Sequence, residues 1–543
     1  MRVRRVRHGV LAVVMAGGVL LAGCSGGGGD GRASADDKSR RGGGQALPAP
    51  APASPGGGEG ATPGDEERDA APPADHLSTF ALDVDTASYG FARRTLAEGR
   101  LPDPATVRPE EFVNSFRQDY PGPDGDGFSV SVDGARTDEE GWSLVRVGLA
   151  TRAAEGSERP PAALTFVIDV SGSMAEPGRL DLVKKSLGIM TDQLRPDDSI
   201  ALVTFSDTAE TVLPMTRLGE GGGSRARVHA AIDRLEPTRS TNLEAGITNG
   251  YDTAVRGKEK GATNRVVLLS DALANTGETS ADGILERISD ARREHGITLF
   301  GVGVGSDYGD ALMERLADKG DGHTTYVSDD EDAREVFCEQ LPAHIELRAR
   351  DAKAQVAFDP ESVERFRLIG YDNRRVADED FRDDSVDGGE IGPGHQVTAL
   401  YAVRAKPGAD GHLATASVRW LDPESRAPHE ESGRIEAADL AESLWRADGG
   451  LQVAAVAAYF ADGLRSGAGG RPKPYGVRAL PGTPSLGELA ARARELPTGT
   501  GGTGGSGGQQ PVRELTTAIE QAARLADETD FTTREPRGDV RPG

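Results

Sequence analysis

Cysteine is nearly absent from this chain: only Cys24 and Cys338 occur among its 543 residues. Two cysteines exclude a disulfide framework and a zinc site built from cysteine. Cys338 lies in a helical pattern and is predicted to be a small core residue. Long apolar runs are missing as well, because the run at residues 10–21 is too short to span a bilayer and no other is long enough. No transmembrane segment is therefore predicted.

Positive charge is in deficit. The chain carries 62 Lys and Arg against 87 Asp and Glu, which gives a formal net charge of −25 at pH 7. So acidic a protein repels phosphate, and neither nucleic acid nor an anionic lipid surface is an expected partner. The acidic surplus is most simply explained as a means of keeping an exported protein soluble.

Sequence motifs of known enzyme chemistry are also missing. Residues 301–306 nearly match a dinucleotide fingerprint, but Ser306 stands where the last glycine belongs, so this segment is predicted to be a buried strand end. The Gly-x-Ser-x-Gly matches at residues 23–27 and 504–508 lie in low-complexity sequence and not at a nucleophile elbow. The nine histidines are scattered, without a His-x-x-x-His pair. We therefore do not predict an enzyme.

Three further polar features have simpler structural interpretations. Asp83 and Asp85 alternate on a predicted strand, where they could act as paired carboxylates or a secondary cation site; bonds to nearby loops are favoured. His395 follows Gly394 at a strand start and is predicted to be a turn or interface residue. The acidic run at residues 378–380 is predicted to be a solvated loop.

The N-terminus has the organisation of an export signal. Four arginines lie within residues 2–7, and the apolar run at residues 10–21 follows them. Leu21-Ala22-Gly23-Cys24 then resembles the bacterial lipobox, which implies cleavage before Cys24 and acylation of its thiol. An ordinary secretory signal with an incidental cysteine is the alternative, and both Sec and twin-arginine export remain open. The sequence thus predicts a signal peptide at residues 1–23 and a lipid anchor at the extracytoplasmic face of the cell membrane.

The rest of the chain divides by composition and pattern. Gly, Pro, Ala and charged residues dominate residues 24–75, which are predicted to be a disordered tether with a reach of about 40 Å. We expect five regions after the signal peptide: this tether, an N-terminal extension with a helix and strands (76–161), an α/β domain (162–341), a β-sandwich-like segment (342–435) and a helical C-terminal region (436–543).

Short apolar runs alternate with amphipathic helical patterns in the α/β domain. The runs cover residues 164–168, 200–205, 266–269 and 297–304. Buried strands that alternate with helices predict a doubly wound parallel sheet, whose ligand site lies at the carboxyl ends of the strands. Strand patterns before and after this domain predict that it is inserted between β-rich flanking segments that pair with each other.

Oxygen-bearing side chains follow the predicted strands. Asp169, Ser171 and Ser173 form an Asp-x-Ser-x-Ser turn directly after the first strand. Thr241 lies in a loop between two helical patterns, and Asp271 follows the third apolar run. Because the carboxyl ends of parallel strands meet at one edge, we expect these five side chains to converge. Carboxylate and hydroxyl oxygens suit a hard divalent cation, and a hydroxyl-rich set leaves the cation able to accept a carboxylate from outside.

At these residues the sequence resembles the von Willebrand factor type A domain, a Rossmann-like fold whose metal-ion-dependent adhesion site (MIDAS) signature corresponds to residues 169–174. The resemblance implies that Ser171, Ser173 and Thr241 contact Mg²⁺, or Mn²⁺ or Ca²⁺, directly or through water. It implies that Asp169 and Asp271 act mostly through bridging waters. Ala272 departs from the glycine that many relatives have after the aspartate.

The flanking sequence resembles YfbK-type bacterial lipoproteins, which carry extensions on both sides of such a domain. The segments that carry this resemblance are residues 78–89, 108–114, 311–320, 367–371 and 390–401. The expected function is adhesion, scaffolding or envelope complex assembly, in which the metal accepts an acidic residue of a protein partner. Two alternatives are a metal-dependent hydrolase of the cell envelope and a structural protein whose site holds no metal.

Overall fold

The computed structural model describes residues 76–82, 86–125, 127–152, 159–271, 281–304, 316, 324–327, 333–334, 336–337, 347–384, 386, 388–423, 425–466, 479–497 and 510–533. All of them belong to one unit, Ala61–Gly543. The predicted signal peptide, Cys24, the tether, Asp83, Asp85, Ser306 and Cys338 lie outside the described residues. Within the described residues, no helix combines the length and the hydrophobicity needed to cross a bilayer.

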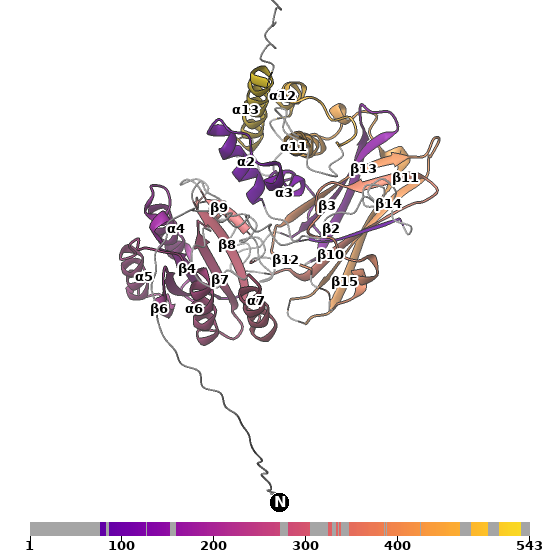
Figure 1. Ribbon diagram of the computed structural model, residues 1–543. Coiled ribbons are helices and arrows are strands. Elements are labelled where there is room, and N and C mark those ends of the chain that lie inside the picture. The colour runs from indigo at the N-terminus through magenta and orange to yellow at the C-terminus, as the bar shows by residue number, and fades with distance from the viewer. Residues whose placement is uncertain are drawn as a thin grey trace, which may run out of the picture. The chain divides into compact units, whose positions relative to one another are not determined.

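A six-stranded sheet forms the centre of the α/β domain, in the order β6-β5-β4-β7-β8-β9 (Figure 1). Its strands are β4 (Ala162–Asp169), β5 (Ser199–Phe205), β6 (Ala209–Arg217), β7 (Thr263–Ser270), β8 (Thr298–Val304) and β9 (Thr324–Val327). β5, β4, β7, β8 and β9 are parallel neighbours, whereas β6 pairs with β5 in the antiparallel direction. The domain is therefore α/β as predicted, with an added antiparallel edge strand.

Helices cover both faces of this sheet. On one face α4 (Leu180–Gln193) and α5 (Gly223–Asp233) share a core with the β4 side chains of Leu164, Phe166 and Ile168. On the other face α6 (Leu243–Arg256) and α7 (Ala281–His295) pack with Val167 of β4 and with Val266 and Leu268 of β7. All eight β4 side chains are buried, which explains why the predicted strands are continuous apolar runs and not alternating ones.

The segments before and after the α/β domain build two further sheets together. β3 (Trp142–Thr151) pairs with β13 (Gln396–Ala405), so chain from both sides of the insertion lies in the sheet β11-β13-β3-β2. The second sheet runs β1-β10-β14-β15, with β12 (Gly389–Ile391) paired to β10. The other strands are β1 (Leu77–Ala81), β2 (Phe128–Arg136), β10 (Ala349–Phe358), β11 (Val363–Leu368), β14 (His412–Leu421) and β15 (Pro428–Glu436). Apolar side chains of both sheets form one core, as in a β-sandwich.

Both ends of the described chain also contribute to a helical layer. α2 (Ala87–Ala97) and α3 (Pro109–Asn114) come from the N-terminal extension, whereas α11 (Gly449–Arg465), α12 (Leu486–Glu495) and α13 (Gln510–Thr533) come from the C-terminal region. Their buried side chains share a core, which includes Phe112 of α3, Phe460 of α11 and Ile519 of α13 (Figure 1). The helical C-terminal part is thus completed by two helices from the other end of the chain.

Candidate metal centre

The Asp-x-Ser-x-Ser turn leaves the end of β4 in a tightly bonded conformation. Asp169 is fully buried, and the backbone N–H of Ser171 donates to its Oδ1 at 2.8 Å. The hydroxyl oxygens of Ser171 and Ser173 are 3.1 Å apart. Met174 is fully buried in the core beneath, and it anchors the short 3-10 helix Gly172–Ala175. The turn therefore presents a carboxylate and two hydroxyls from one edge of the sheet.

The pairing of β4 with β7 brings Asp271, which follows the third predicted strand, to this turn. Ile168 lies opposite Leu269 in the parallel register, so Ser270 and Asp271 follow beside Asp169. The Ser270 hydroxyl donates to Asp169 Oδ2 at 2.6 Å. Asp271 is only 1% exposed. Ser270 is a contributor that sequence reasoning did not single out, although it immediately precedes a predicted ligand.

The loop that carries Thr241 is fixed to the ends of β4 and β5. The Thr238 N–H donates to the Val170 carbonyl at 2.6 Å, and the Asn242 N–H donates to the Ser206 carbonyl at 2.6 Å. Between these anchors Ser240 has a φ of 63°, a conformation uncommon for residues other than glycine. Thr241 is buried. Contacts within the turn thus bring Asp169, Ser171 and Ser173 together, and Asp271 follows Ser270, which bonds Asp169. Thr241 lies in a loop anchored at the ends of β4 and β5.

Arg179 is a residue of this site that the sequence did not reveal. Its Nη1 donates to Asp271 Oδ2 at 2.7 Å and to the Ser173 carbonyl at 3.1 Å. A second ion pair joins its Nη2 to Glu176 at 2.8 Å. Arg179 is 2% exposed although it directly precedes α4. The sequence places Arg179 after a glycine at the start of a predicted helix, but this position does not identify Asp271, 92 residues away, as its partner.

The donor set fits a hard divalent cation. Asp271 Oδ1 is buried and has no hydrogen-bond partner, and such an orphaned acceptor is costly unless a cation or water meets it. Burial raises the pKa of Asp169, although hydrogen bonds from Ser270 and Ser171 oppose the shift. Among the residues that the structure describes, no three His, Cys, Asp or Glu side chains are placed so that they could hold a metal ion together. Cation binding at this edge would therefore depend on the serine and threonine hydroxyls as much as on the two carboxylates.

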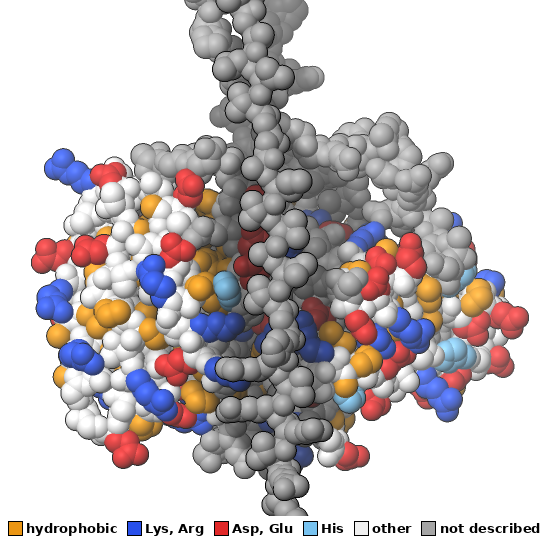
Figure 2. Space-filling view, turned by 90° about the horizontal axis from the view of Figure 1, so that it is seen from below, with side chains coloured by type: hydrophobic (Ala, Val, Ile, Leu, Met, Phe, Trp, Pro, Cys, Tyr) orange, Lys and Arg blue, Asp and Glu red, His pale blue; other side chains and the backbone are white. Residues whose placement is uncertain are grey.

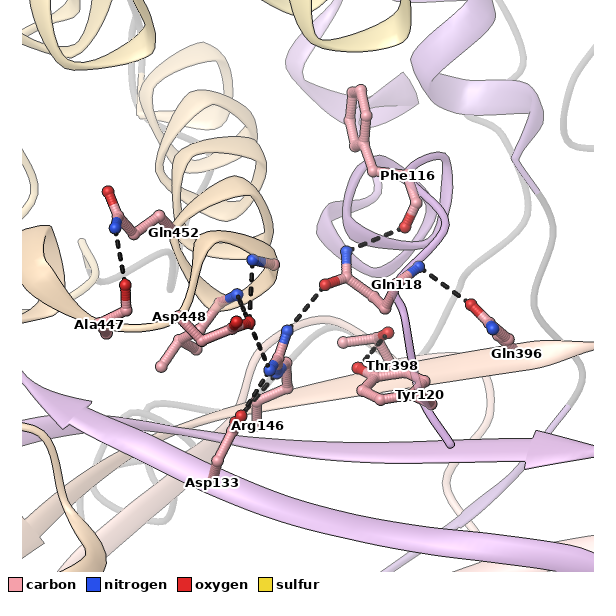
Figure 3. A network of polar contacts seen from close by, with 12 residues as sticks. Phe116, Gln118, Tyr120, Asp133, Arg146, Gln396, Thr398, Ala447, Asp448 and Gln452 are labelled. Atoms are coloured by element: carbon pink, nitrogen blue, oxygen red, sulfur yellow. Dashed lines mark hydrogen bonds and ion pairs between the residues drawn. The ribbon is translucent and has the colours of Figure 1, made fainter. Parts of the chain in front are cut away.

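A second polar cluster, centred on Arg146 of β3, serves the architecture (Figure 3). Its guanidinium makes two bonds to Asp133 of β2, at 2.9 and 2.5 Å, and reaches Asp448 at 3.1 Å. Asp448 in turn accepts the backbone N–H groups of Gly450 and Leu451 at the start of α11. Arg146 also donates to Gln118 at 2.7 Å and lies over the ring of Tyr120. The cluster joins sheet to helix, and its carboxylates are occupied by this cation.

On the face drawn in Figure 2, the described residues that are visible show no concentration of charge of one sign. Figure 2 shows Lys and Arg side chains interspersed with Asp and Glu among the described residues on this face, with hydrophobic side chains scattered between them. Such mixing is typical of an ordinary solvated surface.

Three family models match segments of this chain. A family model described as the von Willebrand factor type A domain matches residues 163–339. A model described as the C-terminal part of the uncharacterized protein YfbK matches residues 345–410, and one described as von Willebrand factor matches residues 64–143. A solved structure of a von Willebrand factor type A protein from Catenulispora acidiphila is 16% identical, covers 75% of this chain and 88% of that one, and has a TM-score of 0.41.

Curated relatives extend the match beyond the α/β domain. The uncharacterized protein YfbK of Escherichia coli (strain K12) is 35% identical over 379 residues, which are 64% of this chain and 65% of YfbK. Inter-alpha-trypsin inhibitor heavy chain H3 of Homo sapiens is 26% identical over 188 residues, which are 33% of this chain and 21% of that protein. The matches thus span less than two thirds of these relatives' lengths. The chain thus carries a von Willebrand factor type A domain followed by sequence that matches the C-terminal part of YfbK, and it is similar to YfbK over 379 residues.

Proposed function

We propose that this chain is a lipid-anchored protein of the cell envelope whose A domain binds a protein partner through a divalent cation. Domains of this type commonly mediate protein–protein interactions. The observation that carries the metal proposal is the buried, unpartnered Oδ1 of Asp271 beside the Asp169 turn. Asp169, Ser171, Ser173, Thr241 and Asp271 would hold Mg²⁺ or Mn²⁺, which supplies an electrophilic centre for a carboxylate oxygen.

The remaining residues of the site would orient this set. Ser270 and the Ser171 N–H hold both oxygens of Asp169, so its carboxylate is fixed before any ligand arrives. The anchors of Thr238 and Asn242 hold the loop of Thr241 in the same way. A partner presenting an exposed Asp or Glu would then meet a preorganised site, and preorganisation reduces the entropy lost on binding.

The test is titration calorimetry with Mg²⁺ and Mn²⁺, followed by capture of partners from envelope extracts. Asp169→Ala should abolish both metal binding and metal-dependent capture while the far-UV circular dichroism spectrum stays unchanged. Asp207→Asn is the matched control, because Asp207 is an exposed carboxylate in the loop after β5. Capture that is indifferent to EDTA and to Asp169→Ala would refute the adhesion proposal. Mg²⁺-dependent turnover of phosphoester or peptide substrates would favour the hydrolase alternative instead.

A further inference from the structure

Arg179 adds a positive charge to the candidate metal centre, whose predicted metal ligands are all acidic or neutral. Its guanidinium is buried against Asp271 Oδ2 at 2.7 Å, while the other oxygen of that carboxylate, Oδ1, has no hydrogen-bond partner. One oxygen of the Asp271 carboxylate therefore bonds the Arg179 guanidinium, and the other is available to a bound metal ion. The same arginine bonds the carbonyl of Ser173, one of the predicted ligands, and so contacts both halves of the site.

The charges at this centre do not balance once a divalent cation is bound. Asp169 and Asp271 supply two negative charges, and both residues are at most 1% exposed. A divalent cation alone would neutralise them, but Arg179 adds a further buried positive charge. Glu176 also pairs with Arg179, yet its side chain is 64% exposed, so water screens its contribution. The loaded site would carry a net positive charge in a poorly screened environment, where such charges interact strongly.

We propose that Arg179 couples cation binding to carboxylate binding. By occupying one oxygen of Asp271 it weakens the site for a cation alone, and the resulting excess charge is relieved when an anionic ligand joins the cation. Because coupling between two ligands is reciprocal, the cation must strengthen carboxylate binding by the same factor. Arg179 is thus a positioning and specificity-determining residue, and it makes an acidic partner a requirement for tight metal binding. This inference rests on the proposed metal-dependent function of the same site.

The experiment measures Mn²⁺ affinity of the full chain by titration calorimetry and by Mn²⁺ electron paramagnetic resonance, with and without acetate as the carboxylate probe. In the wild-type protein acetate should strengthen Mn²⁺ binding several-fold. Arg179→Met removes the charge but keeps an apolar side chain of comparable length. This variant should bind Mn²⁺ alone on the order of tenfold more tightly and should lose the acetate effect. Arg179→Lys keeps the positive charge, so acetate should still strengthen Mn²⁺ binding in this variant.

A structural role for Arg179 predicts a different pattern. Removing a cation that only supports the fold would lower thermal stability and leave Mn²⁺ affinity unchanged or reduced. That outcome in Arg179→Met, or an acetate effect that survives in this variant, would overturn the inference. If Arg179→Met does not fold, loss of the acetate effect in Arg179→Lys would overturn it equally. Failure of the underlying function is distinguishable, because wild-type protein would then bind Mn²⁺ no better than Asp169→Ala.

Discussion

The Ser270 hydroxyl donates to Asp169 Oδ2 at 2.6 Å and so joins the ends of two adjacent parallel strands. With the Ser171 N–H on Oδ1, both oxygens of this buried carboxylate are held by neutral donors. Neutral donors orient a carboxylate without neutralising it, so its charge remains available to a cation. Within the part of the chain that the structure describes, no cationic side chain bonds Asp169 directly, so this acid is buried without a charged partner. The free energy of unfolding should reflect this.

Asp169→Asn should stabilise the metal-free protein. Burial raises the pKa of Asp169, so in the folded state its charged form is disfavoured relative to the unfolded chain. A carboxyl with a raised pKa contributes stability below its unfolded pKa, near 3.9, and loses it as the pH rises. Asparagine keeps the acceptor for Ser171, and the rotatable Ser270 hydroxyl can accept from its amide. We expect Tm in EDTA at pH 7 to rise by about 2–4 °C, measured by calorimetry.

In the presence of Mg²⁺ the wild-type protein should have a higher Tm than Asp169→Asn, which is the reverse of the order expected in EDTA. The wild-type Tm should increase with Mg²⁺ concentration, because a ligand that binds only the folded state stabilises it, whereas Asp169→Asn should not respond. An Asp207→Asn variant should follow the wild type in both conditions. If Asp169→Asn has a lower Tm than the wild type in EDTA, the interpretation that the buried Asp169 carboxylate destabilises the metal-free protein is wrong.

Asp198→Asn should destabilise the A domain by about 2–4 kcal/mol at pH 7. Asp198 is fully buried at the entry to β5, where it bonds the Arg159 guanidinium and the backbone N–H groups of Ala162 and Arg195. It therefore fastens the chain that enters β4 to the loop that enters β5. Chemical denaturation followed by circular dichroism would measure the loss, with Asp207→Asn, a change at an exposed carboxylate of the same domain, as the control.

The pH dependence of this variant follows from the pKa of Asp198. Burial works against the charge of this carboxyl, but the Arg159 guanidinium and the two N–H groups outweigh it and lower the pKa. A lowered pKa means that the carboxylate stabilises the fold above its unfolded pKa, near 3.9, and that this stabilisation is lost as the pH falls through the folded value. The difference in unfolding free energy between wild type and Asp198→Asn should thus be full at pH 7 and shrink below about pH 4. A pH-independent difference would contradict this assignment.

Arg146→Met should destabilise the junction between the β-sandwich and α11. Arg146 is 6% exposed, and its removal leaves Asp133, Asp448 and Gln118 without their shared cation. Both carboxylates are partly exposed and can be rehydrated, so we expect a loss of about 2–3 kcal/mol in the unfolding free energy. A double-mutant cycle with Asp133→Asn should show strong coupling, whereas exposed Arg136→Met should show little effect. Additive losses would indicate that the network of Figure 3 contributes no shared stability.

Periodicity predicted the A domain well because its strands are buried on both faces. The apolar runs at residues 164–168, 200–205, 266–269 and 297–304 all became strands, and the ends of the first and third meet at Asp169 and Ser270. The edge strand β6 was not predicted. It is partly exposed and contains Pro214, which is a residue tolerated at sheet edges but atypical of strands.

Contacts between distant parts of the chain could not be predicted from local pattern. Arg179 lies at the start of a helix, where a basic residue has no special meaning, and only the register of β4 with β7 brings Asp271 to it. Likewise, the helical patterns of α2 and α13 gave no sign that they share a core. The acidic run at residues 378–380 was predicted to be a solvated loop, yet it forms a 3-10 helix, and its Asp378 accepts from the Thr79 hydroxyl at 2.6 Å.

Cys24→Ser should release the protein from the membrane. The predicted lipobox makes the Cys24 thiol the acylated group, and acyl chains bind membranes in proportion to the methylenes they bury. Metabolic labelling with a fatty acid should mark the wild type and Cys338→Ser, since Cys338 lies in a predicted core helix. Cys24→Ser should lose the label and appear in the soluble extracytoplasmic fraction with its metal binding intact. Label that persists in Cys24→Ser would refute lipid anchoring at this residue, and the ordinary secretory signal would then be the better explanation of the N-terminus.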